Sequence, residues 1–148
     1  MQLDLSSNSI GGHYEPDGYD SDGDEVNKFV SDLSGVQAIS DALRVSASLT
    51  SLSLGDNPLG DQGIEALSVG LKESKSLATL DLSNHHDNST KFGPKGAAAL
   101  ASAIAAMASL TSLNLSKNDL GAEGAKALAP GISASASVTS VWTPAHQP

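Results

Sequence analysis

The sequence contains no cysteine, one arginine and only five aromatic residues among its 148 residues. Without cysteine, the chain can form neither a disulfide framework nor a thiolate metal site. With so few aromatic side chains, a core must be built from Leu, Ile, Val and Ala, and the hydrophobic content of 39% allows this. No apolar run approaches the roughly 18 residues that a membrane-spanning helix needs.

Positive charge is also scarce, with eight Lys and Arg residues against 17 Asp and Glu residues and a net charge of −9. This balance argues against electrostatic binding to nucleic acid or anionic lipid. The polar start MQLDLSSNSI does not resemble a signal peptide. We therefore expect a soluble, intracellular protein of one domain.

The sequence is similar to itself at a regular interval. Segments that begin at Leu49 (LTSLSL), Leu77 (LATLDL), Leu110 (LTSLNL) and Val138 (VTSVW) start 28, 33 and 28 residues apart. The unit is therefore 28 residues long, and one copy has five extra residues. An earlier copy begins with LDLSSNSIGG and resumes at Ser34 after about 21 additional residues. A fixed period of this length predicts a solenoid of stacked repeats.

Each unit combines two hydrophobic periods. In its first half, leucines such as Leu52 and Leu54 alternate with small polar residues, as in a strand with one buried face. In its second half, apolar residues such as Leu67 and Leu71 recur four apart, as on one face of a helix. The pattern predicts one strand followed by one helix in every unit.

An asparagine follows the expected strand in three copies, at positions 8, 57 and 118. An amide side chain there can satisfy backbone groups that are left unpaired where the chain turns. In the copy that begins at Leu77, the same position is His85, so we expect that turn to be held differently.

These features resemble the leucine-rich-repeat family, in its ribonuclease-inhibitor-like class of 28-residue repeats. The pattern LxxLxLxxN, followed by GxxxLxxxL, is matched in four copies over residues 1–10 and 34–142. The resemblance implies an α/β solenoid that forms a short horseshoe arc, with parallel strands on the concave face and helices on the convex face. It also implies a non-catalytic protein-interaction or scaffolding module, such as an accessory subunit of a larger assembly.

We expect a single domain over residues 1–148. Its units are residues 1–48 with an acidic insertion at about 12–33, residues 49–76, residues 77–109 with a short insertion at about 85–91, residues 110–137, and a terminal strand within 138–148.

The residues that alternate with the leucines should face the open side of the sheet. Most of them are small and polar, which is more typical of a solvated sheet than of a binding surface. Only Trp142 belongs to the residue types that dominate binding hot spots. The candidates on this concave face are Asp4, Ser53, Asp81, Asn114 and Trp142.

The two insertions fall at the same place in their repeats, between the strand and the helix, so they should emerge on one rim. The first carries seven of the 17 acidic residues, and Lys91 and Lys95 near the second could meet this acidic run. We prefer this rim as the protein-binding site, although a solvated, partly disordered loop is an alternative. The rim candidates are Tyr14, Tyr19, Asp20, Asp22, Asp24, Phe29, His85, His86 and Lys91.

Two groups suggest metal binding, but neither has a complete motif. The alternating Asp20, Asp22 and Asp24 would begin a calcium loop, yet its sixth and twelfth positions hold Glu25 and Ser31 instead of Gly and Glu. A second cluster, HHD at residues 85–87, consists of adjacent side chains that diverge. We assign no metal, cofactor or catalytic residue. The alternative function is a regulatory domain that binds a ligand or divalent metal through the rim loops.

The first expected strand has no capping element before it, since Leu3 and Leu5 already carry the strand pattern. An uncovered edge with apolar side chains is a site for docking or association. We therefore expect a protein partner, or self-association through the N-terminal strand.

Overall fold

The computed structural model describes residues 1–86 and 90–143. Its helices and strands, in order, are β1 (Gln2–Asp4), β2 (Gly11–Tyr19), β3 (Glu25–Asp32), α1 (Ser34–Val45), β4 (Ser51–Ser53), α2 (Gly60–Leu71), β5 (Thr79–Asp81), α3 (Pro94–Ala106), β6 (Ser112–Asn114), α4 (Gly121–Ala134) and β7 (Ser140–Trp142).

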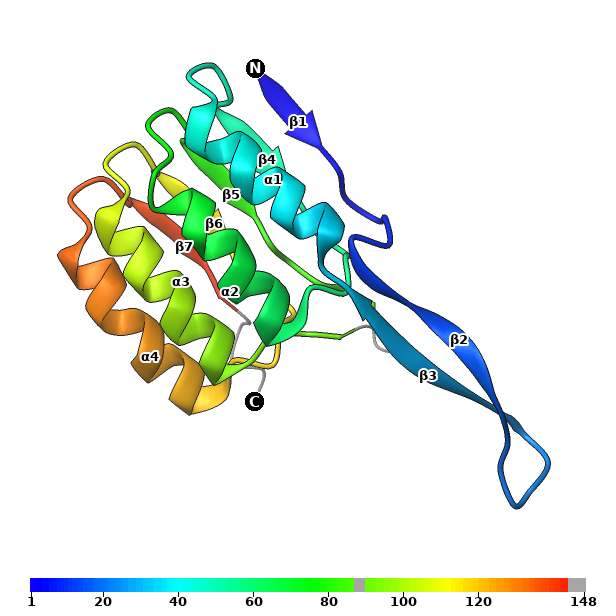
Figure 1. Cartoon of the computed structure of the whole chain (residues 1–148). Coiled ribbons are helices and arrows are strands. Elements are labelled where there is room, and N and C mark those ends of the chain that lie inside the picture. The colour runs from blue at the N-terminus through cyan, green and yellow to red at the C-terminus, as the bar shows by residue number, and fades with distance from the viewer. Residues whose placement is uncertain (87–89, 144–148) are drawn as a thin grey trace.

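One strand and one helix alternate through most of the chain. The strands form a parallel sheet in the order β1-β4-β5-β6-β7, and the four helices form a layer over one of its faces (Figure 1). The expected α/β leucine-rich-repeat arc is confirmed. No helix within the described ranges has the length and apolar character needed to cross a membrane.

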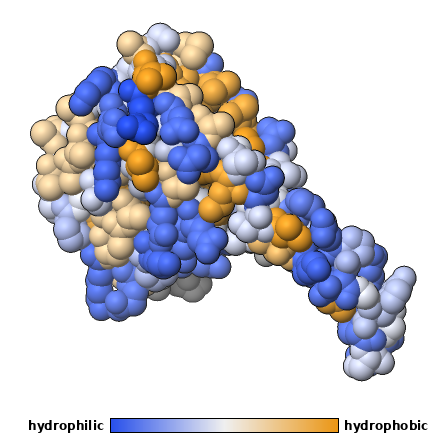
Figure 2. All heavy atoms as spheres, in the orientation of Figure 1, coloured by the Kyte–Doolittle hydropathy of each residue, from blue (hydrophilic) through white to orange (hydrophobic). Residues whose placement is uncertain are grey.

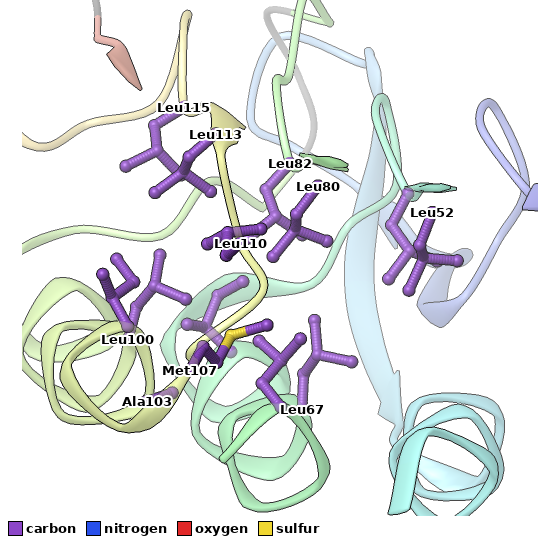
Figure 3. Packing of buried hydrophobic residues seen from close by; sticks show 14 of the residues in the cluster. Leu52, Leu67, Leu80, Leu82, Leu100, Ala103, Met107, Leu110, Leu113 and Leu115 are labelled. Atoms are coloured by element: carbon purple, nitrogen blue, oxygen red, sulfur yellow. The ribbon is translucent and has the colours of Figure 1, made fainter. Parts of the chain in front are cut away.

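The core lies between the sheet and the helices. The central residue of each strand lies in one register row, which joins Leu52, Leu80 and Leu113 across the sheet, and these three side chains are fully buried. They point toward helix residues such as Leu67 and Leu100 (Figure 3). Because each repeat contributes the same leucines at the same positions, the core continues from one repeat to the next.

The first insertion is a β hairpin and not an irregular loop. Strands β2 and β3 pair antiparallel as a separate two-stranded sheet, and the hairpin projects away from the solenoid (Figure 1). At its root, Gly11 and Gly12 are buried and have φ angles of 111° and 147°. A side chain on Gly11 would overlap the backbone of Pro58, so the hairpin sits directly on the second repeat.

Candidate functional site

A buried asparagine holds the turn that supports the hairpin. The Asn57 side-chain amide nitrogen donates to the carbonyl oxygens of Leu54 and Leu5, at 3.0 and 2.9 Å. Its side-chain oxygen accepts the backbone N–H groups of Asn8 and Ile10, both at 3.2 Å. One side chain thus ties its own turn to the first repeat, which is the role expected of this position.

The corresponding turn of the third repeat is held by Asn84 instead of His85. Asn84 is only 2% exposed, while His85 lies at the surface. The turns of the first, second and fourth repeats each contain a residue with positive φ just before the asparagine, for example Asp56 at 57°. In the third repeat, Asn84 is equivalent to Asp56, but its φ is not positive. The turn asparagine of this repeat therefore lies one residue earlier than in the other three repeats.

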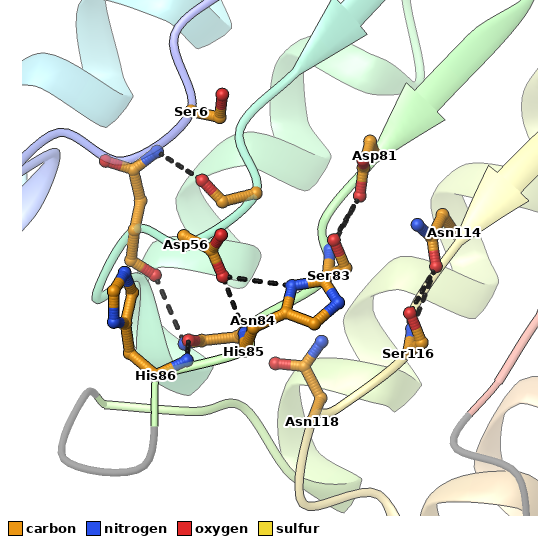
Figure 4. A network of polar contacts seen from close by, with 12 residues as sticks. Ser6, Asp56, Asp81, Ser83, Asn84, His85, His86, Asn114, Ser116 and Asn118 are labelled. Atoms are coloured by element: carbon orange, nitrogen blue, oxygen red, sulfur yellow. Dashed lines mark hydrogen bonds and ion pairs between the residues drawn. The ribbon is translucent and has the colours of Figure 1, made fainter.

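This shift directs His85 toward the second repeat. Its backbone N–H donates to Oδ1 of Asp56 at 2.6 Å, and its ring Nδ1 lies 3.2 Å from the same oxygen (Figure 4). Burial by itself raises the pKa of Asp56, but the two contacts from His85 and the charges of His85 and His86 outweigh it. The pKa of Asp56 is therefore lowered, and the carboxylate is ionised at neutral pH.

A groove of about 450 Å³ lies at the root of the hairpin, where the two insertions approach each other. His13 and Tyr14 of β2 line it from the first insertion, and His86 lines it from the second. The remaining lining residues belong to the first two turns and the hairpin root: Ser7, Asn8, Ser9, Gly12, Asp56 and Pro58.

Of the nine rim candidates, only Tyr14 and His86 line this groove. Sequence reasoning missed Asp56, and the available signal was its place directly before Asn57 in a turn next to both insertions. The expected attraction between Lys95 and the acidic run is wrong, because Lys95 pairs with Glu65 of α2 at 3.3 Å.

Both strands of the hairpin carry aromatic and acidic side chains. The rings of Tyr14 and Phe29 are in contact and tilted relative to each other, with centroids 5.2 Å apart and planes at 59°. Tyr14 is 46% exposed, and Tyr19 near the tip is 77% exposed. Lys28 pairs with Asp17 at 3.5 Å and is the only lysine among the residues of the hairpin, 11–32. The hairpin is therefore strongly negative, and the face of it seen in Figure 2 is mostly hydrophilic.

The alternating aspartates at the tip form a turn. Oδ1 of Asp20 accepts the backbone N–H groups of Asp22 and Asp24, at 2.9 and 3.0 Å. This bonding is typical of a turn that begins with aspartate. Within residues 1–86 and 90–143, no three metal-ligating side chains lie together. Asp87, the third residue of the HHD cluster, lies outside the described residues.

The five concave-face candidates lie in a single row across the open face of the sheet. The strand register aligns Asp4, Ser53, Asp81, Asn114 and Trp142.

The side-chain oxygens of Asp4, Asp81 and Asn114 in this row accept hydrogen bonds from nearby serines. Oδ1 of Asp81 accepts the N–H and hydroxyl of Ser83, at 2.9 and 2.7 Å, and Asn114 has the same relation to Ser116 (Figure 4). Asp4 is bonded likewise, and the Ser6 hydroxyl lowers its pKa. Trp142 is the aromatic residue of this row, and it is 64% exposed.

At the other end of the solenoid, β1 is the outermost strand of the sheet. Met1 and Leu3 are 66% and 38% exposed there. Within the described residues, β1 thus pairs with β4 alone and carries exposed apolar side chains.

Comparison with known proteins supports the repeat assignment. A family model described as "Leucine Rich repeat" matches residues 45–68 and 106–129, which are equivalent strand-turn-helix segments of the second and fourth repeats. No curated protein matches the sequence.

The fold is similar to a solved structure titled "Leiomodin-1 Actin-Binding Site 2 (ABS2)", with a TM-score of 0.63 and 19% identity. The match covers 76% of this chain and 63% of that chain, so this chain spans less than two thirds of that structure. Repeat spacing, the matched family model and the fold agree that the chain contains leucine-rich repeats and has the fold of a short leucine-rich-repeat arc.

Proposed function

We propose that this chain is a non-catalytic protein-interaction module, and that its main binding surface is the hairpin rim. We define the hairpin rim as the β2–β3 hairpin together with the groove residues His13, Tyr14, Asp56 and His86. The observation that carries the proposal is the hairpin itself, an ordered projection inserted into a repeat. A two-stranded hairpin gains little stability by itself in water, so an exposed one on a rigid frame is well suited to contact another molecule.

Side-chain chemistry favours the hairpin rim over the open sheet face. Tyr14 and Tyr19 are exposed on the hairpin, and tyrosine is enriched at binding hot spots. On the sheet face, Asp81 and Asn114 already accept hydrogen bonds from neighbouring serines. A partner that used those groups would have to compete with the serines. Trp142 is the best contact residue of that face and makes it the second candidate surface.

The fold by itself does not select a partner. The printed title of the leiomodin structure names an actin-binding site of that protein. At 19% identity, the likeness is one of fold, and we carry no actin binding over to this chain.

The proposal can be tested by affinity capture with three forms of the chain. These are the unchanged protein, a form in which a short Gly-Ser turn replaces residues 12–33, and Trp142→Ala. We expect the shortened form to lose the specific partners that the other two retain, and thermal unfolding should show that all three remain folded. An unchanged set of partners for the shortened form would reject the hairpin rim, and loss of partners from Trp142→Ala alone would favour the sheet face.

The open edge of β1 supports a second mode of association, between two copies of the chain. An unpaired strand edge with apolar side chains pairs readily with another strand. Sedimentation velocity over a wide range of protein concentrations measures this directly. A concentration-dependent dimer would support self-association, whereas a monomer at every concentration would exclude it and leave the edge to a different protein.

A further inference from the structure

We infer that the groove at the root of the hairpin receives a lysine or arginine side chain from an extended, basic segment of the partner. The inference rests on the proposed function and adds the chemistry of the partner. Three observations bear on it: a groove of suitable lining, a carboxylate and an aromatic ring on its walls, and the charge of the neighbouring strands.

The groove offers the two groups that hold a cationic side chain. Asp56 lines it as a carboxylate whose side chain is 24% exposed. Both contacts from His85 use Oδ1, and a carboxylate has two oxygens with about four acceptor positions between them. Tyr14 also lines the groove, and the face of an exposed tyrosine ring attracts a nearby cation.

The groove walls are fixed in position. Gly12 is so close to the ring of Phe29 that a side chain there would overlap it, and the Phe29 ring packs in turn on Tyr14. Asp56 precedes Asn57, whose side chain is bonded within its own turn and to the turn of the first repeat. A preformed site of this kind loses little conformational entropy when a ligand binds.

Charge complementarity selects the occupant. Residues 11–32 contain seven carboxylates and one lysine, and Asp22 and Asp24 at the tip are exposed. A segment that left the groove along the hairpin would therefore meet negative charge over its whole length. His13 and His86 also line the groove, but His13 pairs with Glu15 at 2.9 Å and the seven carboxylates of the hairpin outnumber these two imidazoles. A basic segment fits this surface, and an acidic segment would be repelled.

Peptide binding to the intact chain tests the inference. The probe is a fluorescent twelve-residue Gly-Ser peptide with four arginines, and its matched controls carry four glutamines or four glutamates. We expect measurable binding of the arginine peptide at low salt and none of the glutamate peptide. A glutamine peptide that bound as tightly as the arginine peptide would overturn the inference.

Two groove variants locate the site. Asp56→Asn removes the charge but keeps an oxygen for His85, and Tyr14→Leu removes the ring face but stays apolar. We expect each to weaken binding of the arginine peptide about three- to fivefold or more. Tyr14→Phe should retain most of the affinity because it keeps the ring.

Glu123→Gln on α4 is the control for general electrostatic attraction, because it removes the same charge far along the solenoid from the hairpin. We expect it to change the affinity by less than about twofold at moderate salt. If it weakened binding as much as Asp56→Asn, the peptide would be held by the net charge of the chain and the groove would be rejected.

The outcomes separate this inference from the proposed function. If removal of the hairpin abolished partner capture while the arginine peptide failed to bind, the interaction module would stand and the basic partner would be rejected. If the peptide bound at the groove while partner capture survived removal of the hairpin, the groove would stand and the hairpin rim would be rejected as the main surface.

Discussion

The solenoid and the hairpin are held together in different ways. In the solenoid, Leu52, Leu80 and Leu113 are fully buried in a core that runs through successive repeats. In the hairpin, every residue from 13 to 28 is exposed. Its order depends on strand pairing, on one aromatic contact and on the two glycines at its root. Hydrophobic burial therefore stabilises the solenoid, whereas the hairpin depends on the solenoid for its position.

This difference separates stability from recognition. A substitution in the core should unfold the repeats, because neighbouring repeats share one hydrophobic layer. A substitution in the hairpin should change what the surface presents while the repeats stay folded. Matched substitutions in the core and in the hairpin therefore test this separation.

Leu80→Ala should have the largest effect on stability. Leu80 is fully buried in the central strand β5, and truncating a buried leucine usually costs about 2–5 kcal/mol. Phe29→Ala removes a larger side chain from the hairpin, yet we expect it to lower the free energy of unfolding by less than about 1 kcal/mol. Urea denaturation followed by circular dichroism measures both. A larger loss for Phe29→Ala would show that the hairpin belongs to the folding core.

Asn57→Ala should be the next most damaging change. It removes a buried side chain that joins two turns, and it leaves backbone groups without partners, at a cost of about 2–3 kcal/mol. Asn8 is the matched control, because its exposed side chain bonds only within the first turn, to Leu5 and Ser6. We expect Asn8→Ala to cost less than about 1 kcal/mol in the same denaturation experiment. Equal losses would show that the link between repeats adds nothing to the bonds within a turn.

The strands and helices of the solenoid could be predicted because the same residue pattern occurs in several copies. Leucines at fixed spacing predict the strands and helices, and an error at one position is corrected by the other copies. Phe92 illustrates this, since its alignment with Leu59 and Leu120 predicts a core side chain, and it is 2% exposed.

The hairpin could not be predicted in the same way, because it occurs once. Its first strand contains Gly18 and Pro16, which disfavour strands, and the pairing shifts register between Pro16 and Tyr19. Only contact with the second strand decides its structure. The alternation of aspartates at the tip likewise suggests a metal loop, but it belongs to a turn bonded by Asp20.

The groove depends on a shift of one residue that no spacing reveals. The repeat pattern places His85 at the position of the inward asparagine, and in the structure Asn84 takes that role. His85 then reaches Asp56, a residue of a different repeat. The contact depends on the backbone angle at residue 84, which the sequence pattern does not contain.

Gly12→Ala should loosen the hairpin while the repeats stay folded. The side chain would overlap Phe29 and Val30, and the φ of 147° is unfavourable for alanine, at a combined cost of about 1–3 kcal/mol. Hydrogen exchange should then speed up in residues 13–28 and stay unchanged in the helices. Gly18 is the control, because its φ is also positive, at 106°, but a side chain there meets nothing within 4 Å. Equal effects of both substitutions would mean that backbone angle alone, and not the packed root, holds the hairpin.

The smallest effect should be the pH dependence that Asp56 contributes. Its pKa in the folded chain is lowered from the ordinary aspartate value of 3.8, so folding favours the ionised form. This stabilisation is fully present above the unfolded pKa, near 4, and is lost as the pH falls through the folded pKa. Asp56→Asn removes the titrating group, and asparagine tolerates the φ of 57° at this position.

We therefore expect the unchanged chain to be more stable than Asp56→Asn at pH 7, and the gap to close as the pH falls below about 4. Urea denaturation of both proteins at several pH values gives this difference directly. Asp4 and Asp32 also have lowered pKa values, each mainly through the hydroxyl of a nearby serine, and they contribute equally to both curves. They therefore cancel in the difference, which isolates the carboxylate at the groove. A gap that stayed constant from pH 7 to pH 2 would mean that the substitution acts through the shape of the turn and not through the charge of Asp56.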